Sequence, residues 1–193
     1  MRFEYAPGAT PIDPDEAAGL IPAHITLQHE LNEYEEANIL EATEWLCSRR
    51  RGDPLDENFI REVHRRMFGH VWKWAGQQRR SDKSIGVPWF EIPGSLRQSL
   101  GDIRAQIGHG AYPPAEIAAR FHHRLVAVHV FPNGNGRHAR LAADLLLTQL
   151  VGRRFEWGRG SLLQASALRA HYIAALRAAD AGDYGLLLSF LNI

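Results

Sequence analysis

The segment that most constrains this chain is HVFPNGNGRHAR, residues 129–140, which separates two apolar stretches with helical periodicity. The stretch before it reads AEIAARFHHRLVAV, and the stretch after it, LAADLLLTQL, is apolar on nearly every side. A helix that is apolar all round belongs in a protein interior, so the second stretch is expected to be the central buried helix. The sequence therefore predicts a helical core with a polar, glycine-rich loop at its centre.

Composition narrows the class of protein. The chain has 193 residues, of which 45% are apolar, and this is enough for one domain with its own core. Its 22 basic residues balance its 22 acidic ones, which makes direct nucleic-acid binding unexpected. Cys47 is the single cysteine, so no internal disulfide is expected. No apolar run reaches the roughly 20 residues that span a bilayer, and we expect a cytoplasmic protein without membrane contact.

Helix signals recur along most of the chain. Residues 1–25, which are rich in proline and small residues, are expected to form an extended N-terminal arm. A helix is expected over residues 26–51, where the breaker sequence RRRGDP ends it, and the next helix begins after the N-cap Asp56. Further helices are predicted around Leu96–Ile107, from Pro114 to Val128, over LAADLLLTQL, and over two tail stretches, LLQASALRAHYIAALRAAD and YGLLLSFL. Residues 26–193 are therefore predicted to form a single, all-α domain.

One short stretch breaks this helical pattern. Residues 83–92, here called the flap segment, lie within SDKSIGVPWFEIP, where apolar residues alternate around a glycine and a proline. Alternation with period two is typical of strands, and glycine and proline mark turns and bulges. The sequence therefore predicts a small β-hairpin here.

The central loop has the residues of an anion site with a base beside it. Gly134-Asn135-Gly136 can take positive φ angles cheaply, and successive amides in such a turn converge on an anion. The following helix adds its N-terminal amides and its dipole. Arg137 and Arg140 lie three residues apart, so both point from one face of the first turn and can grip phosphate oxygens. His129 has an unperturbed pKa of about 6.5, which leaves the ring able to accept a proton at pH 7.

Each of these features is ordinary when taken alone. An Asn-Gly turn, a single histidine at a helix end and two surface arginines occur in many proteins without a ligand. A second alternative is a metal-dependent hydrolase, but the spacing of two histidines four apart around a glutamate is absent. The candidate ligands of such a metal site are His122, His123, His129, His138 and Asp144. Packing roles are favoured for them, and Asp144 is expected to satisfy a buried hydrogen-bond donor. The basic clusters at 49–51, 79–80 and 153–154 are expected to lie on the solvated surface.

The full string resembles the Fic family signature, His-x-Phe-x-(Asp or Glu)-Gly-Asn-Gly-Arg-x-x-Arg. Asn133 fills the acidic position of that signature, and the other seven specified positions match: His129, Phe131, Gly134, Asn135, Gly136, Arg137 and Arg140. The resemblance extends over roughly residues 55–191. In detail the chain is similar to the subgroup called mobile mystery protein B, which is often encoded beside a helix-turn-helix partner.

This resemblance implies a fold and an activity. Fic proteins are all-helical, and most transfer AMP from ATP to a hydroxyl group of a target protein. His129 would then take the proton from the attacking hydroxyl, and Phe131 would anchor the loop in the core. The flap segment would bind an extended stretch of the target by strand addition. The implied phosphate ligands are Gly134, Asn135 and Gly136, together with Arg137 for the β-phosphate and Arg140 for the γ-phosphate.

Asn133 departs from the family pattern. In the family, the acidic residue at this position holds Mg²⁺ against the α- and β-phosphates of ATP. Asn133 offers a carbonyl oxygen but no negative charge, so the resemblance implies weaker metal binding and reduced transfer. A nucleotide-binding regulatory protein without transferase activity is therefore the main alternative to an enzyme.

The resemblance also implies self-inhibition. Many Fic proteins carry a glutamate, in a Ser/Thr-x-x-x-Glu-(Gly/Asn) motif, that pairs with the second signature arginine and occupies the γ-phosphate position. This chain offers Thr26 and Glu30 within TLQHEL, although Leu31 does not fit the last position. We expect Glu30 to be the inhibitory residue of a helix within residues 26–51. Another acid on that helix, at Glu33, Glu35 or Glu36, and inhibition by a separate partner chain remain alternatives.

Overall fold

The computed structural model describes residues 12–22, 24–25, 27–48, 52–159 and 167–191, and the regular secondary structure of these parts is helical. None of the helices described is long and apolar enough to cross a lipid bilayer. The α-helices are α1 (Pro14–Ala17), α2 (Gln28–Ser48), α3 (Glu57–Phe68), α4 (Ile92–His109), α5 (Pro114–Val128), α6 (Asn135–Val151), α7 (Ala167–Asp180) and α8 (Gly185–Leu191).

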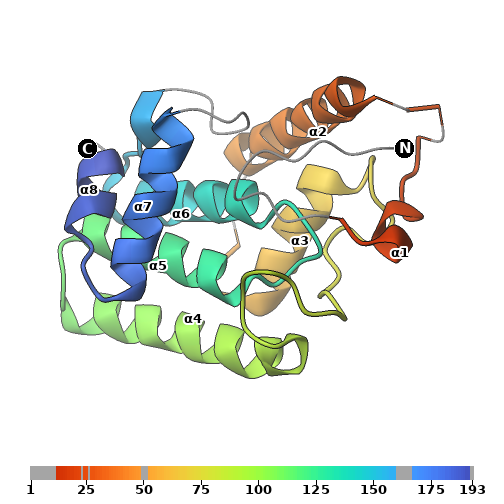
Figure 1. The fold of residues 1–193 in the computed structure, drawn as a ribbon. Helices are drawn as coiled ribbons and strands as arrows, with labels where there is room; N and C mark the ends of the chain where they lie inside the picture. Colours follow the sequence, from red (N-terminus) through yellow and green to blue (C-terminus); the bar gives the residue numbers. More distant parts are fainter. Residues whose placement is uncertain (1–11, 23, 26, 49–51, 160–166, 192–193) are drawn as a thin grey trace.

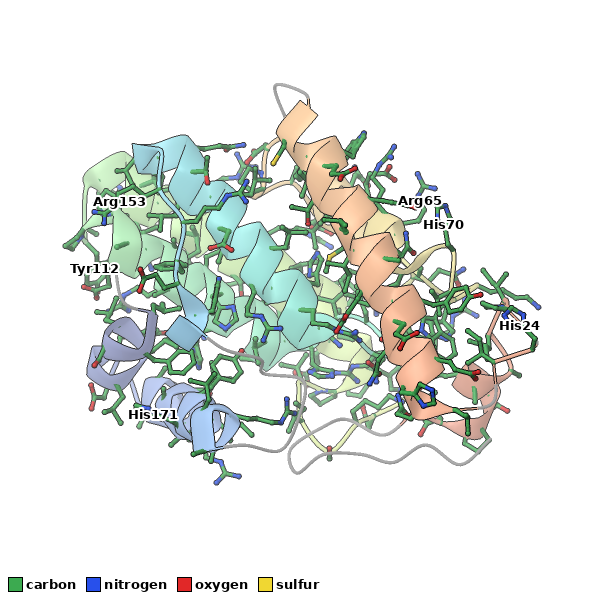
Figure 2. The ribbon with its side chains drawn as sticks, turned by 90° about the horizontal axis from the view of Figure 1, so that it is seen from above. His24, Arg65, His70, Tyr112, Arg153 and His171 are labelled. Carbon is green, nitrogen blue, oxygen red and sulfur yellow. The ribbon has the colours of Figure 1, made fainter. Side chains whose placement is uncertain are left out.

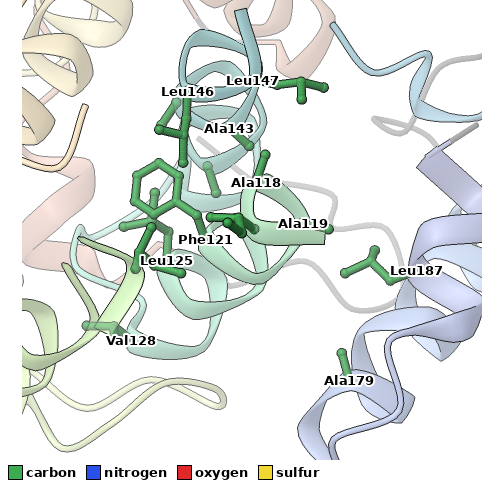
Figure 3. Close-up of a cluster of buried hydrophobic side chains, with 14 of the residues drawn as sticks. Ala118, Ala119, Phe121, Leu125, Val128, Ala143, Leu146, Leu147, Ala179 and Leu187 are labelled. Atoms are coloured by element: carbon green, nitrogen blue, oxygen red, sulfur yellow. The ribbon is translucent and has the colours of Figure 1, made fainter. Parts of the chain in front are cut away.

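Helices α5 and α6 form the centre of the main core, and α4, α7 and α8 pack around them (Figure 1). Figure 3 shows α5 contributing Phe121 and Leu125 to this core, and α6 contributing Leu146 and Leu147. Phe121 and Leu147 are fully buried. The prediction that LAADLLLTQL forms the central buried helix is therefore confirmed, and the core fixes both ends of the loop at residues 129–134.

A second apolar cluster joins α2 and α3 to the turn at residues 71–75. Its members include Leu31 and Leu46 of α2, which are almost fully buried, and Trp72, which is 1% exposed. Asp56 caps α3 as the sequence predicts, because its side chain accepts a hydrogen bond from the Phe59 amide at 2.9 Å. Figure 2, seen from above, shows α2 running beside α6, so this second cluster brings α2 next to the central loop.

The N-terminal arm is not simply extended where it is described. Residues Pro14–Ala17 form the short helix α1, which Asp13 and Glu16 close with a reciprocal capping box. The chain then packs against the turn at residues 71–75, where Leu20 and Trp72 form an isolated β-bridge. The arm therefore belongs to the folded domain from residue 12 onward.

The predicted β-hairpin at residues 83–92 is wrong. All ten residues are described and none is in a strand; residues 84–87 form bends, Trp89–Glu91 form a short 3₁₀ helix, and Ile92 begins α4. The physical reason is the buried side chain of Arg79, which donates hydrogen bonds to the carbonyls of Ser81 and Val87. These two carbonyls accept from the Arg79 side chain instead of from a partner strand, and Pro88 has no amide to offer a ladder.

Candidate functional site

The centre of the site is the turn from α5 into α6. Helix α5 ends at Val128, and His129 follows in the left-handed conformation with φ 55° and ψ 62°. This conformation reverses the chain direction, and a residue other than glycine adopts it only where its surroundings enforce it. Phe131 is fully buried and stacks on His64 with 3.7 Å between ring centroids. The phenylalanine therefore anchors the turn in the core, as predicted.

The side chain of Asn135 closes this turn from inside. Its Oδ1 accepts a hydrogen bond from the Phe131 amide at 2.9 Å, and its Nδ2 donates one to the Phe131 carbonyl at 2.8 Å. The residue is 4% exposed. Both ends of the side-chain amide therefore bond the loop itself, which leaves the backbone N–H of Asn135 as its main group for a ligand.

The backbone around the two glycines forms the start of α6. Gly134 has φ 77°, and a Cβ at this position would lie 2.6 Å from the Phe68 ring, so both the conformation and the close approach require glycine. A Cβ at Gly136 would meet no atom within 4 Å, so the first turn of α6 faces open space on that side. Within α6 the first helical hydrogen bond runs from the His138 amide to the Gly134 carbonyl. The amides of residues 135–137 precede it and are oriented for an anion.

The two signature arginines lie in different environments. Arg137 donates from Nη1 to the Oε2 of Glu35 at 2.6 Å, and its guanidinium lies 4.9 Å from the centroid of the Phe68 ring. Burial lowers the pKa of Arg140, and the positive charge of Arg137 lowers it further. An anion at the start of α6 would relieve this repulsion between like charges.

The surroundings of His129 keep its ring neutral. The residue is 4% exposed. Burial lowers the pKa of His129 to about 4, and the positive charges of Arg79 and Lys83 contribute, against a hydrogen bond to the Val126 backbone that favours the charged ring. At pH 7 the imidazole is therefore unprotonated and can accept a proton.

Two other histidines, His64 and His138, support the loop. The sequence predicts no role for His64, and a packing role is the favoured expectation for His138. His64 on α3 accepts the Gly76 amide at Nδ1, so its Nε2 is the donor to the Asn133 carbonyl at 3.0 Å. His138 donates from Nε2 to the Ile60 carbonyl at 3.0 Å. Burial lowers the pKa of His64 well below its usual value, and that of His138 to about 4. Both rings are neutral parts of the scaffold, and no local sequence signal marks them as such.

The metal-hydrolase alternative finds no support in the described residues, which contain no group of three or more histidine, cysteine or acidic side chains able to hold a metal ion. His122 bonds the Tyr172 hydroxyl, and His123 lies between Asp180 and the Tyr184 hydroxyl. Asp144 satisfies buried donors as predicted: its carboxylate accepts the Phe155 amide and the Trp157 indole N–H, both at 3.0 Å.

Asn133 is a poor ligand for Mg²⁺ in this geometry. Its side-chain oxygen already accepts the Gly134 amide at 2.6 Å, and it has no charge. Mg²⁺ is held in proteins by carboxylates together with substrate phosphates and water. The donor set of the loop therefore does not fit a dedicated magnesium site.

The acidic partner on α2 is Glu35, whereas the sequence analysis favoured Glu30. Glu30 accepts a hydrogen bond from the Leu27 amide at 3.1 Å, at the start of the helix. Thr26, the other half of the expected motif, lies outside the described residues. Glu35 is 5% exposed and accepts hydrogen bonds from the Trp72 indole N–H and from Arg137, each at 2.6 Å. The expected inhibitory pair is with Arg140, the second signature arginine, whereas the ion pair in the structure is with Arg137, the first. Glu35 is one of the acids given above as alternatives to Glu30.

Arg79 is the largest difference from the sequence analysis. It was expected on the surface with Arg80, but it is 1% exposed and bonds the backbone of His129.

An open cavity of about 650 Å³ lies away from the signature loop, between α2, α3 and the turn at residues 69–77. Arg65 and His70, which line it, lie on the side of α2 away from α6 in Figure 2. None of its lining residues comes from the signature loop.

Comparisons with known proteins agree on one family. A model of the Fic/DOC family matches residues 54–147. The chain is 32% identical over 128 residues to protein adenylyltransferase fic-1 of Caenorhabditis briggsae, and 29% identical over 136 residues to protein adenylyltransferase Fic of Aedes aegypti. These alignments cover 64% and 68% of this chain, but only 24% and 26% of the relatives, so the chain spans about a quarter of their length.

Solved structures share the fold. The Fic domain of Bep8 from Bartonella sp. 1-1C superposes with a TM-score of 0.70 at 15% identity, covering 88% of this chain and 87% of that one. BepC from Bartonella tribocorum, solved with bound AMPPNP, superposes with a TM-score of 0.69 at 16% identity, covering 93% and 96% of the two chains.

Proposed function

This chain belongs to the Fic/DOC family through residues 54–147, and from that premise we propose that it transfers AMP from ATP to a hydroxyl group of a target protein. The single observation that carries the proposal is the juxtaposition of a buried, neutral His129 with the amide-rich start of α6 and its two arginines. Relatives with this family's domain are named protein adenylyltransferases.

His129 is the proposed general base. The target hydroxyl attacks the α-phosphate, the bond from that phosphorus to the bridging oxygen breaks, and pyrophosphate leaves. The hydroxyl proton passes to the His129 ring, whose low pKa keeps it neutral at pH 7. His129 directly follows α5, in the turn that leads to the start of α6, where the nucleotide phosphates are proposed to bind.

The phosphate cradle is proposed to be the backbone of Gly134, Asn135 and Gly136 with the side chains of Arg137 and Arg140. The helix dipole and the amides of residues 135–137 favour negative charge, and the two guanidinium groups neutralise the leaving pyrophosphate. Little covalent work is required of the protein, so alignment and charge stabilisation supply most of the rate. ATP is the proposed substrate, and no step is assigned to Mg²⁺ through Asn133.

We also propose that this form of the chain is self-inhibited by Glu35 on α2. Its carboxylate pairs with Arg137, which is one of the proposed phosphate ligands, and the pair is largely buried. An arginine engaged in this way cannot also hold a phosphate oxygen at full strength. Inhibition by a separate partner chain is the alternative. The resemblance to mobile mystery protein B, a subgroup often encoded beside a helix-turn-helix partner, supports it. We place the reaction in the cytoplasm.

The second candidate is a nucleotide-binding regulatory protein that has lost transferase activity. Asn133 favours it, because the loop lacks an acidic metal ligand. ATP affinity does not separate the two, since both bind nucleotide. Product formation does separate them.

The test is incubation of the purified chain with α-labelled ATP, Mg²⁺ or Mn²⁺, and cell lysate, followed by mass spectrometry of the labelled proteins. We expect serine, threonine or tyrosine residues with one added AMP, and free pyrophosphate in equal amount. Tight ATP binding with no labelled protein, in the Glu35→Gln variant as well as the parent, would establish the regulatory alternative.

A further inference from the structure

A buried arginine with no role in the proposed chemistry joins the flap segment to the site. We propose that Arg79 is a positioning residue that fixes the flap segment and the backbone of His129 as one unit. The inference rests on the proposed function only in so far as His129 is the base.

The contacts of Arg79 all converge on the two segments it joins. Its Nε donates to the His129 carbonyl at 2.7 Å and its Nη2 to the Val128 carbonyl at 3.5 Å, at the end of α5. The same Nη2 donates to the Val87 carbonyl within the flap segment, and Nη1 donates to the Ser81 carbonyl at 2.8 Å, just before it. The Arg79 amide also donates to the Val130 carbonyl at 3.0 Å, so backbone and side chain hold consecutive residues of the turn.

The charge of Arg79 is balanced mainly by carbonyl dipoles. Asp82 forms an ion pair with it at 3.8 Å through a side chain that is 67% exposed, and the charge of Glu16 also favours the charged guanidinium. A buried charge is tolerated only when its hydrogen bonds are made, and Arg79 makes them to carbonyls that include the C-terminal end of α5. The planar fork of guanidinium donors can reach several carbonyls at once, which a lysine ammonium cannot do in the same geometry. The site therefore requires the shape of arginine as well as its charge.

The flap segment also touches His129 directly. Gly86 has φ 103°, and a Cβ there would lie 2.6 Å from the His129 Cβ and 2.8 Å from Nη2 of Arg79. The segment thus approaches the base as closely as a backbone without a side chain allows. Two further hydrogen bonds join the flap segment to the residues just before it. The Gln78 side chain donates to the Trp89 carbonyl, and the Trp89 amide donates to the Asp82 side chain. Movement of the flap segment would therefore disturb the backbone of His129 through Arg79.

The experiment compares Arg79→Met and Arg79→Lys with Arg80→Met, in which the neighbouring, exposed arginine is changed instead. The first measurement is made on the backbone by NMR and does not require activity. In the parent we expect residues 84–87 to have order parameters near the rigid value of about 0.85, and below about 0.6 in both Arg79 variants. Arg80→Met should match the parent.

The second measurement is the pKa of His129, followed by NMR titration. The charged groups that act on the ring are Arg79 and Lys83, and Lys83 is itself paired with Asp13 and Glu16. Burial is the largest cause of the low pKa of His129, so a loosened flap segment should raise that pKa in both variants. Arg79→Met also removes a positive charge and should raise it further than Arg79→Lys, which keeps the charge. A purely structural arginine would give the same result in both variants.

The third measurement is transfer in the Glu35→Gln background. Both Arg79 variants should lose about 10²-fold in kcat with ATP affinity unchanged, because a small displacement of the base costs this much. Mobile residues 84–87 in the parent, or Arg79 variants that keep rigid flap amides and full transfer, would overturn the inference. If the Glu35→Gln parent transfers nothing, the proposed function fails, while the order parameters and the His129 pKa still decide the role of Arg79.

Discussion

At the scale of single residues, the environment of His129 predicts an unusual pH dependence. A free histidine with a pKa of 6.5 is about nine-tenths protonated at pH 5.5, so a base of that kind would lose about tenfold in rate between pH 7.5 and 5.5. The lowered pKa of about 4 keeps the ring neutral over this range. Transfer by the Glu35→Gln variant should therefore stay nearly constant from pH 7.5 to 5.5. A rate that falls with a midpoint near pH 6.5 would show that the ring is not in this buried environment.

Asn133 gives a second prediction at this scale. Asn133→Asp adds a negative charge at the end of the loop, just before α6, and restores an ionic oxygen ligand. We expect transfer to rise and to become more strongly dependent on Mg²⁺, because carboxylates are the ligands that this ion prefers. Titration of Mg²⁺ at fixed ATP measures the effect, with Asn133→Ser as the uncharged control. A lower rate in Asn133→Asp with ATP still bound would mean that the loop serves another chemistry.

At the scale of elements, α2 is proposed to inhibit the site through the ion pair between Glu35 and Arg137. Glu35→Gln keeps an oxygen that can accept the Trp72 N–H but removes the charge that pairs with Arg137. Transfer should rise by at least about tenfold, which corresponds to about 1.4 kcal/mol. Glu30→Gln is the matched control on the same helix, since Glu30 bonds the Leu27 amide, and it should leave the rate unchanged. If Glu30→Gln activates and Glu35→Gln does not, the inhibitor is Glu30.

The helices show what local sequence can predict. Asp56, the apolar stripe of α5 and the all-apolar face of α6 are signals carried by neighbouring residues, and the structure confirms each of them. The flap segment carried an equally clear strand pattern, yet it forms bends and a 3₁₀ helix. Its conformation is set by Arg79 and by its packing against His129, and neither contact is visible in a local pattern.

In the candidate site, as in the fold, the sequence predicts what neighbouring residues determine and misses contacts between distant segments. The signature residues lie together because they are consecutive in the chain, and α5 and α6 fix both ends of the loop. Glu35 and Arg137 are more than one hundred positions apart, so which of several acids on α2 faces the loop depends on how that helix packs. His64 was not predicted for the same reason, since it reaches the Asn133 carbonyl from α3.

At the scale of the whole molecule, buried neutral histidines predict acid sensitivity. Burial lowers the pKa of four of them: His64, His122 to about 3, His129 to about 4 and His138 to about 4. In the unfolded chain each of these histidines takes up a proton near pH 6.5. Below that pH the unfolded state therefore binds more protons than the folded state, and the free energy of unfolding decreases as the pH is lowered. The raised pKa of Asp144 acts in the opposite direction but is a single group.

We expect the free energy of unfolding to fall by about 1.4 kcal/mol or more between pH 7 and pH 5, the equivalent of one pKa unit. Urea titrations at several pH values measure it. His138→Gln keeps a donor for the Ile60 carbonyl and removes one titrating ring, so its slope with pH should be smaller. Equal stability at pH 7 and pH 5 would contradict the assignment of neutral buried rings.

The central claim is that His129 is the base of an AMP transfer at the start of α6. The most direct measurement compares incorporation of label from α-labelled ATP by Glu35→Gln with that by Glu35→Gln/His129→Ala, alongside the ATP affinity of both. We predict equal affinity and a loss of transfer of about 10²- to 10⁴-fold in the double variant, the usual contribution of a general base. Transfer that survives unchanged without the His129 ring would contradict the claim.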